Sequence, residues 1–384
     1  MRFDLDRYLS SARRAVLDEI RAIVGSKGRY DPILYQLMLD YPLREAKGLR
    51  PALCMATCRA LGGRLEAVLP SAAVLELYHN AFLVHDDIED ASLVRRGAPT
   101  LHEQHGVPIA VNVGDGMLSL ALQPLLDNVP EIGLGPALRI LQAVAHMCRE
   151  TVEGQALELD WVRQGAWDLG EEDYVELVVK KTGWYSFITP VRVGCIAAGA
   201  DEATLEGLSD FARAVSIAFQ IQDDLLNLEG ELDAYGKEIG GDLWEGKRTV
   251  MLLHALRTCS DDERAWALDL LARPRPDAEG ARLGTLVDEL HARGSLDAAG
   301  HAALQEALAR ATGGVALAPK TEPEVRALLA LLERQGSLAH GREVAERWAA
   351  EASTRLDAFL ARTPASVHTR FLQALVDYVH RRAR

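Results

Sequence analysis

Apolar residues recur every three or four positions along most of this chain, with polar residues between them. The first such run contains Leu5, Leu9, Ala12, Val16 and Ile20. This spacing places apolar side chains on one face of an α-helix. Long stretches with the same character follow at residues 66–90, 108–127, 135–164, 171–198, 203–229 and 245–258. Alternating β-branched runs and hairpin turn signals are scarce, so the pattern predicts an all-α protein of roughly a dozen helices.

One segment near the C-terminus looks different. Residues 274–321 begin with a Pro-Arg-Pro-Asp string, end near two adjacent glycines, and hold alanine-rich helical stretches between them. Proline and glycine mark loops between helices. The string LHARGSL at 290–296 returns as LERQGSL at 332–338, and chance similarity of two helix–Gly–helix units explains this more simply than a true repeat. We expect one domain over residues 1–384, with a helical insertion at about 277–320.

Composition and charge exclude several classes of protein. The 384 residues are 48% hydrophobic and 26% charged, which is typical of a soluble globular chain with a sizeable core. The net charge of −14 comes from 42 basic and 56 acidic residues. Such a balance argues against a nucleic-acid-binding surface. A local phosphate site built around metal ions stays compatible with it.

The cysteines and the N-terminus indicate a reducing compartment. Of Cys54, Cys58, Cys148, Cys195 and Cys259, only the first two are close in sequence. They indicate neither a disulfide framework nor a zinc site, and we read the five as small apolar residues. The chain has no uninterrupted apolar run of about 18 residues and no apolar signal-peptide core at its start, so we expect a cytoplasmic protein without a membrane-spanning helix.

The clearest chemical signal is the acidic string Asp86-Asp87-Ile88-Glu89-Asp90, which ends an apolar helix. Residues four apart share a helix face, so Asp86 and Asp90 point the same way and Asp87 flanks them. Grouped carboxylates repel one another unless a cation lies between them. Carboxylate oxygens suit Mg²⁺, which keeps several waters and takes substrate phosphate as a further ligand. Alone, such a motif can also be a solvated acidic helix end.

A second acidic motif makes the metal interpretation stronger. Asp223 and Asp224, within the string QIQDDLLN at 220–227, again end an apolar helix. Carboxylates on facing helices of a bundle can hold a metal cluster between them. Basic clusters accompany both motifs, as a polyanion bridged by Mg²⁺ would require. They lie at residues 47–50, 95–96, 180–181, 237 and 247–248.

Together these motifs resemble the trans-isoprenyl diphosphate synthases, or polyprenyl synthetases. The resemblance runs from about Leu5 to the C-terminus outside the insertion, and its other marks are KTGWYSF at 181–187 and Gly-Lys pairs at 236–237 and 246–247. It implies a single large helical bundle with a central cavity and an Asp-rich motif on each of two facing helices. It also implies a homodimer that condenses isopentenyl diphosphate with an allylic diphosphate, using Mg²⁺, with no nucleic acid and no stable membrane insertion.

The resemblance also assigns roles to individual residues. Asp86 and Asp90 resemble ligands of two Mg²⁺ ions and Asp223 the ligand of a third, with Asp87 and Asp224 completing the metal set. The allylic diphosphate would be held by Arg95, Lys181, Lys237 and Lys247, and isopentenyl diphosphate by Lys47, Arg50, His79 and Arg96. Polar groups near the nascent carbocation would be Thr182, Tyr185 and Gln220. The tail from Tyr378 to Arg384 resembles a segment that closes over the isopentenyl site.

Three departures from the family pattern are visible, and one is the insertion at about 277–320, which has no counterpart in the family. The usual GGKRxRP string is EAKGLRP at 45–51, which keeps Lys47 and Arg50 and loses one base and two glycines. We expect isopentenyl diphosphate binding to survive, at reduced affinity. The second motif ends in Asn227 where the family has Asp. We expect this to be tolerated, because the family's residue at that position does not usually touch the metal.

Product length should follow from the depth of the cavity below the first motif. In the family, aromatic side chains one turn before that motif form a floor that stops growth at C15. Here Ala81 is small and Phe82 is large, so the floor is half open and should admit one more isoprene unit. We expect geranylgeranyl diphosphate, C20, with farnesyl diphosphate (C15) or a C25 diphosphate as alternatives.

Two other functions fit parts of the sequence. A terpene cyclase shares the helical bundle and one Asp-rich motif, but it has no need of an isopentenyl site and normally carries an NDxxSxxxE-type second motif. A non-catalytic regulatory subunit would keep the fold, but such subunits tend to lose one Asp-rich motif. Both motifs are present here apart from Asn227, so the synthase is the favoured interpretation.

Overall fold

The protein is almost entirely helical. The computed structural model describes residues 3–25, 28–90, 92–229, 240–273, 278–311 and 319–382. Within those ranges the only strands are β1 (Val94–Arg95) and β2 (Ala98–Pro99), which form one antiparallel hairpin. The prediction of an all-α protein is therefore confirmed.

The chain divides into two compact units by its internal contacts. The first contains residues 1–164, 171–223 and 342–384, and the second contains residues 165–170 and 224–341. One boundary falls inside the helix α12 (Glu202–Glu229) and another inside α20 (Ser337–Leu360). One synthase domain with an insertion at 277–320 stays a prediction; residues 277 and 312–318 of that segment lie outside the described ranges.

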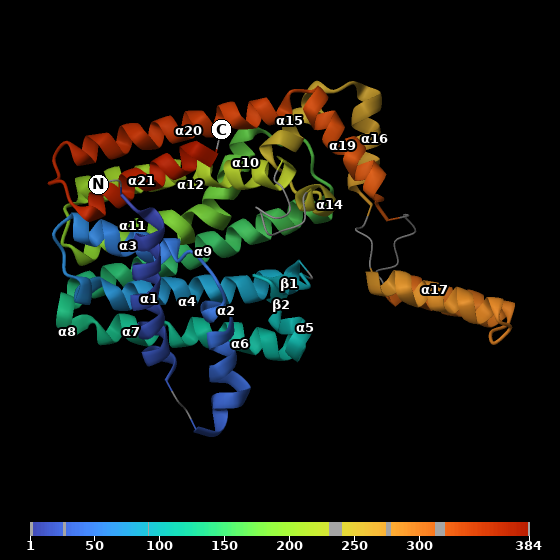
Figure 1. Cartoon of the computed structure of the whole chain (residues 1–384), viewed down its shortest axis with the longest axis horizontal. Helices are drawn as coiled ribbons and strands as arrows, with labels where there is room; N and C mark the ends of the chain where they lie inside the picture. The colour runs from blue at the N-terminus through green and yellow to red at the C-terminus, as the bar shows by residue number, and fades with distance from the viewer. Residues whose placement is uncertain are drawn as a thin grey trace. The chain divides into compact units, whose positions relative to one another are not determined.

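The first unit holds most of the helices (Figure 1). Its α-helices are α1 (Leu5–Val24), α2 (Gln36–Leu43), α3 (Leu49–Ala60), α4 (Leu65–Glu89), α5 (Leu101–His105), α6 (Val107–Leu120), α7 (Leu122–Asp127), α8 (Val129–Ile132), α9 (Leu134–Gln164), α10 (Glu171–Val178), α11 (Thr189–Ala197) and α21 (Val367–Arg382). The unit also contains a 3₁₀ turn, η1 (Gly28–Tyr30), two π-helical segments, η2 (Asp31–Tyr35) and η3 (Val179–Ile188), the β1–β2 hairpin and the greater part of α12 and of α20.

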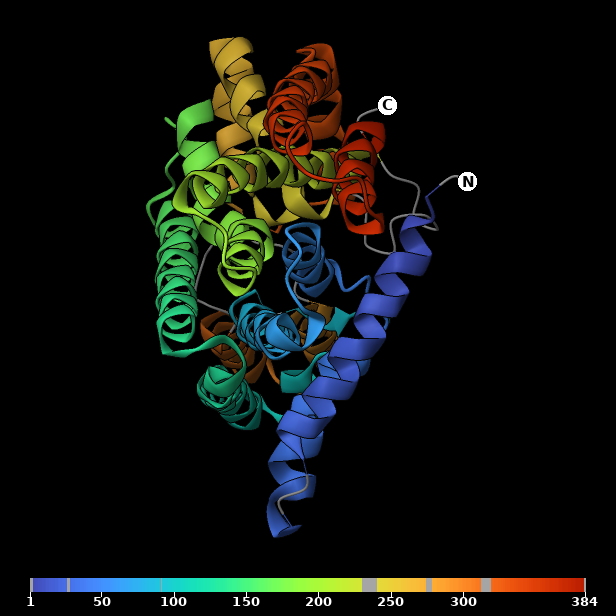
Figure 2. The same cartoon turned by 90° about the vertical axis from the view of Figure 1, so that its left-hand side faces the viewer.

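The central helix of this unit is α4, and its neighbours cover it on several sides. It packs against α1, α3 and α6, and α3 packs against α11 (Figure 1). Gly194 allows the last contact, because a Cβ there would lie 2.6 Å from the carbonyl oxygen of Cys54. α1 crosses α3 and α4 (Figure 2) and buries Leu9, Val16 and Ile20, part of its predicted apolar stripe.

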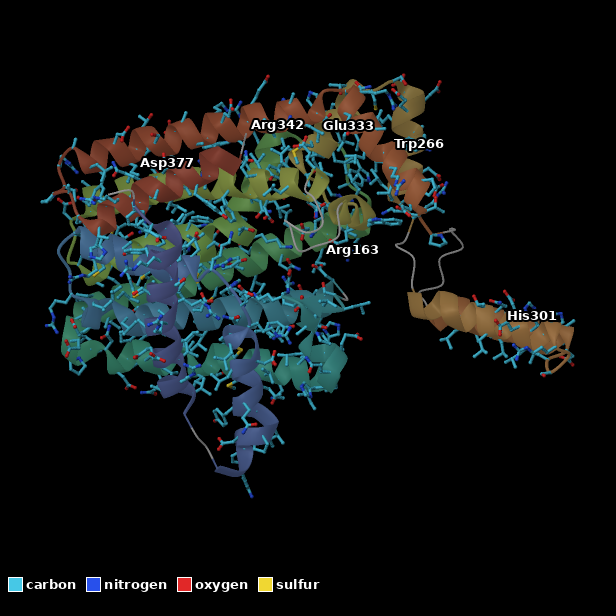
Figure 3. All side chains as sticks on the ribbon, in the orientation of Figure 1. Arg163, Trp266, His301, Glu333, Arg342 and Asp377 are labelled. Atoms are coloured by element: carbon cyan, nitrogen blue, oxygen red, sulfur yellow. The ribbon has the colours of Figure 1, made fainter. Side chains whose placement is uncertain are left out.

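The second unit contains shorter helices. They are α14 (Gly241–Glu245), α15 (Val250–Thr258), α16 (Asp261–Leu271), α17 (Ala278–Ala292), α18 (Ala298–Ala311) and α19 (Glu322–Arg334). Reciprocal side-chain and backbone hydrogen bonds cap two of them, Ser260 with Glu263 on α16 and Thr321 with Glu324 on α19, which satisfies N–H groups that a helix start leaves unpaired. α17 and α18 pack on each other, and His301 of α18 (Figure 3) lies 2.7 Å from Asp288 of α17.

Two helical stretches are long and apolar enough to cross a membrane by length and composition alone. One is α4, whose most apolar window is 78% buried inside the protein. The other is residues 107–132, where the corresponding window is 39% buried. All five cysteines are free thiols. Burial raises the pKa of the Cys58 and Cys148 thiols to about 11 and that of Cys195 to about 12, which agrees with their prediction as apolar residues.

Candidate active site

The first acidic motif ends α4 and directs its carboxylates to different surroundings. Asp86 and Asp87 lie in the last turn and Asp90 caps the helix, its N–H donating to the carbonyl of Asp86 at 2.8 Å. The Asp86 side chain is 28% exposed, that of Asp87 is fully buried, and Asp90 is exposed. Asp86 and Asp90 share a helix face and are accessible, whereas Asp87 lies on a different face and points into the protein.

Asp87 is held by two donors. The Tyr41 hydroxyl donates to Asp87 Oδ2 at 2.5 Å, and Arg95 donates to Oδ1 through Nε at 2.9 Å and through Nη2. Burial, followed by the Asp87 hydrogen bond, raises the pKa of Tyr41, so its phenol is a proton donor at neutral pH. The sequence placed Asp87 among the metal residues, whereas these contacts favour a role in orienting Arg95.

Asp86 lies among cations that the sequence assigned to the allylic diphosphate. Arg95 Nη2 is 3.6 Å and Lys181 Nζ 3.8 Å from its carboxylate, and Lys181 also pairs with Glu158 of α9. Sequence reasoning missed Glu158. Its position in the helix could have revealed it, because Glu158 shares a helix face with the buried residues Gly154 and Trp161. A carboxylate on a buried face requires a hydrogen-bonding or charged partner.

A glycine brings α9 against the segment that carries Lys181. A Cβ at Gly154 would lie 2.4 Å from the Lys181 backbone nitrogen, closer than real Cβ contacts allow. That segment is the π-helix η3. This conformation is rare in proteins, and where it occurs it is often at a functional site. Thr182 and Tyr185, both half-buried, belong to the same segment.

The predicted isopentenyl diphosphate residues form a second cluster. Arg50 Nη1 lies 3.2 Å and Arg96 Nη2 3.4 Å from His79 Nε2, and Arg50 Nη2 donates to Ser186 Oγ at 2.8 Å. Burial and the nearby arginines, Arg50 first, lower the pKa of His79 well below its ordinary value. Because arginine only donates, Nε2 of a neutral His79 accepts and Nδ1 carries the proton.

Lys47 is placed differently from the other members of that set. Its ammonium group donates to the Tyr378 hydroxyl of α21 at 2.6 Å and lies 5.1 Å from the centre of the same ring. The C-terminal helix therefore reaches Lys47, and closure of the tail over the isopentenyl site stays a prediction. The side chains of residues 380–382 and the whole of residues 383–384 lie outside the described part of the chain.

The Tyr185 ring connects this cluster to the predicted chain-length residues. It stacks on His79 with centroids 5.7 Å apart, lies under the Arg50 guanidinium at 4.6 Å, and meets the Phe82 ring edge-on at 5.7 Å. Phe82 is half-buried, and Ala81 is fully buried. One aromatic ring thus contacts the arginine cluster and one of the two proposed floor residues.

The second acidic motif begins in the first unit and ends in the second. Gln220 and Asp223 are half-buried, whereas Asp224 is buried. Lys247 pairs with Glu245 at 2.9 Å and lies 3.6 Å from Asp242. Lys237 lies outside the described residues.

Asn227, at the end of the second motif, binds the backbone of the segment that follows. Its Oδ1 receives the N–H of Asp242 at 3.0 Å, and its carbonyl receives the N–H of Gly240 at 2.7 Å. The residue thereby holds the start of α14, which carries Asp242. Either an amide or a carboxylate oxygen can accept such a bond, and tolerance of the Asn by the enzyme stays a prediction.

The acidic side chains fit a divalent metal that is bound together with a substrate. Among the described residues, no three His, Cys, Asp or Glu side chains are grouped closely enough to hold an ion by themselves. Mg²⁺ is commonly bound by one or two carboxylates, with substrate phosphates and waters as its other ligands. Asp86, accessible and already surrounded by two cations, and Asp90 on the same helix face suit that mode.

Comparisons with known proteins identify the relatives of this chain. The polyprenyl synthetase family model matches residues 31–287. A short chain isoprenyl diphosphate synthase of Methanocaldococcus jannaschii is 34% identical over 63% of this chain and 72% of its own length. A geranylgeranyl diphosphate synthase of Methanosarcina mazei is 32% identical over 75% and 83%, respectively. The crystal structure of geranylgeranyl pyrophosphate synthetase from Pyrococcus horikoshii superposes with a TM-score of 0.77 at 26% identity, covering 98% of this chain and 97% of that one. On this evidence, the chain belongs to the polyprenyl synthetase family.

Proposed function

We propose that this prenyltransferase joins isopentenyl diphosphate head-to-tail to an allylic diphosphate and releases all-trans geranylgeranyl diphosphate. The observation that carries the proposal is a pair of cation clusters, each gathered around one residue of α4. His79, with Arg50 and Arg96, and Asp86, with Arg95 and Lys181, are seven residues apart on α4. Seven residues span about 10 Å of helix, so two diphosphates can be held close to each other without sharing their cations.

The first cluster is charged to receive the allylic diphosphate. Lys181 and Arg95 now pair with the carboxylates of Glu158, Asp86 and Asp87. An arriving diphosphate gives these cations a more highly charged partner, and their donors oppose the negative charge that builds up as it leaves. We assign Lys247 and Lys237 to the same diphosphate by resemblance.

Asp86, released in this exchange, would hold the metal together with other carboxylates of the two acidic motifs. We assign Mg²⁺, three ions per site, to Asp86, Asp90 and Asp223, with Asp224 in support. When bound, the ions act as Lewis acids that assist departure of the diphosphate. Asp87 stays with Tyr41 and Arg95 and orients the guanidinium.

The second cluster would hold isopentenyl diphosphate through Arg50, Arg96 and Lys47. A neutral His79 accepts from both arginines and keeps their guanidinium groups in place. Holding the two substrates next to each other makes the condensation effectively unimolecular. Thr182, Tyr185 and Gln220 are assigned to the surroundings of the allylic cation, and the proton lost from the isopentenyl unit goes to the departing diphosphate.

We further propose that the enzyme is a cytoplasmic homodimer. Large apolar side chains are exposed on α6, α7 and α9, which is more than scattered surface residues explain. They are Val107, Ile109, Val111, Leu122, Leu126, Leu134, Leu138, Val152, Leu159 and Val162. A second copy would cover them, which also accounts for the apolar stretch 107–132 without a membrane. Light scattering should report twice the mass of 42.0 kDa, and fractionation should recover the enzyme in the soluble fraction.

A product assay tests the proposal directly. The purified enzyme is given isopentenyl diphosphate and Mg²⁺ with dimethylallyl, geranyl or farnesyl diphosphate in separate reactions, and the product length is read by mass spectrometry. We expect a C20 diphosphate, loss of turnover with a chelator, and recovery with added Mg²⁺. A C15 or C25 product would keep the reaction and change the length assignment. A cyclic hydrocarbon formed without isopentenyl diphosphate would indicate a cyclase, and no turnover with any primer would indicate a regulatory subunit.

A further inference from the structure

One arginine of each cluster comes from a very small hairpin, Arg95 for the Asp86 cluster and Arg96 for the His79 cluster. β1 and β2 contribute two residues each, with Arg95 opposite Ala98, and Arg96 and Gly97 form the turn. Both turn residues have positive φ, 52° for Arg96 and 76° for Gly97. Two-residue turns of this hand favour Asn-Gly or Asp-Gly. Arg96 is the only residue other than glycine with positive φ in the described chain, a conformation that strains the backbone of an L-residue.

This hairpin needs support from outside itself. A two-stranded hairpin is marginally stable at best even when its strands are longer. Its two arginines also point to different clusters, since Arg95 reaches Asp87 and Arg96 reaches His79. A hairpin that relaxed at the turn would lose both contacts together, so whatever holds its backbone also sets the geometry of both clusters.

Arg44, at the end of α2, is that support. Its Nη1 donates to the carbonyl of Arg95 at 2.8 Å and to that of Ala98 at 3.3 Å, and its Nη2 donates to that of Pro99 at 2.7 Å. The guanidinium is itself oriented by Asp40, at 2.8 Å from Nε, and lies 4.5 Å from the centre of the Tyr41 ring. One side chain therefore bonds both strands on either side of the turn, and only 9% of it is exposed.

We propose that Arg44 is a positioning residue for both diphosphate sites, holding the 94–99 hairpin so that Arg95 and Arg96 are presented to their clusters. This inference rests on the proposed function. Neighbouring residues of α2 act with it, since the Tyr41 carbonyl accepts from Arg96 Nη1 at 3.0 Å. The three carbonyls need a rigid planar fork with several donors, which lysine does not have. A change of Arg44 to Lys keeps the charge and loses the geometry.

The test compares Arg44→Lys and Arg44→Gln with wild type in steady-state kinetics. We expect the KM for isopentenyl diphosphate and for the allylic primer to rise together by about tenfold or more, the loss of one to two charge-assisted hydrogen bonds, with a smaller change in kcat. Hydrogen exchange gives a readout that needs no turnover. The Thr100 amide, bonded to the Leu93 carbonyl at 3.1 Å, should exchange faster in both variants.

The matched control is Arg192→Lys. Arg192 likewise joins two helices by side-chain contacts, to Glu206 at 2.9 Å and to Ser209 at 3.0 Å, but it does not touch the hairpin. It should leave both KM values and the Thr100 exchange rate unchanged. Unchanged KM values in Arg44→Lys beside an active wild type would overturn the inference and leave the proposed function standing. A wild type that forms no prenyl diphosphate would remove both.

Discussion

Replacing the first two aspartates of the α4 motif separately should give two different kinds of damage. Asp87→Asn removes the charge of a fully buried carboxylate, while Arg95 keeps its positive charge. The amide NH₂ of the new side chain would then face either the Tyr41 hydroxyl or the Arg95 guanidinium, both of which donate hydrogen bonds to Asp87. Breaking a buried pair by removing one partner costs about 3–5 kcal/mol. Since 19% of the Arg95 side chain is exposed, water recovers part of this, and we expect a loss of about 2–4 kcal/mol in unfolding free energy.

Asp86→Asn should behave in the opposite way. Its carboxylate is 28% exposed and its two cations are 3.6 and 3.8 Å away, a geometry worth at most about 1 kcal/mol. Stability should stay near that of the wild type, while kcat falls by at least about 100-fold, the scale of losing one charge-stabilising group.

Urea unfolding and steady-state kinetics on both variants distinguish the two roles. For Asp87→Asn we expect a lower unfolding midpoint and a higher KM for the allylic primer, because Arg95 loses its anchor. If Asp87→Asn were as stable as the wild type and simply lost kcat, Asp87 would be a metal ligand and the reasoning from its burial would be wrong.

Three further predictions follow from the same contacts. Ala81→Phe should close the half-open floor and shorten the product from C20 to C15, and an unchanged product would remove Ala81 from the floor. Gly154→Ala places a Cβ 2.4 Å from the Lys181 backbone and should lower the unfolding free energy by about 1–3 kcal/mol and also lower kcat. The control Gly207→Ala, with no neighbour within 4 Å, should leave stability unchanged or slightly higher. Equal stability and kcat in the two variants would contradict the close approach of α9 to Lys181. Because the pKa of His79 is lowered in the folded state, the unfolded chain binds its proton first, so this residue's contribution to stability is complete above about pH 6.5 and is lost as the pH falls. The stability difference between wild type and His79→Gln should therefore shrink in urea titrations from pH 8 to pH 5, and a constant difference would exclude a neutral buried imidazole.

The sequence by itself determined the helical class, both acidic motifs and most of the basic residues near them. These are local properties, because helix periodicity and the i, i+4 relation of Asp86 and Asp90 need only neighbouring residues. The resemblance to a known family also predicted that Arg50, Arg96 and His79 belong to one site.

Only the tertiary structure decided which contacts each of these side chains makes. It turned Asp87 inward to Tyr41, which is 46 residues away, brought Glu158 of α9 to Lys181, and gave Asn227 the task of holding α14. It also showed Arg44 beneath the hairpin that carries Arg95 and Arg96. Each of these contacts joins segments far apart in sequence, and their geometry depends on how helices pack. No local pattern of polar and apolar residues contains that information.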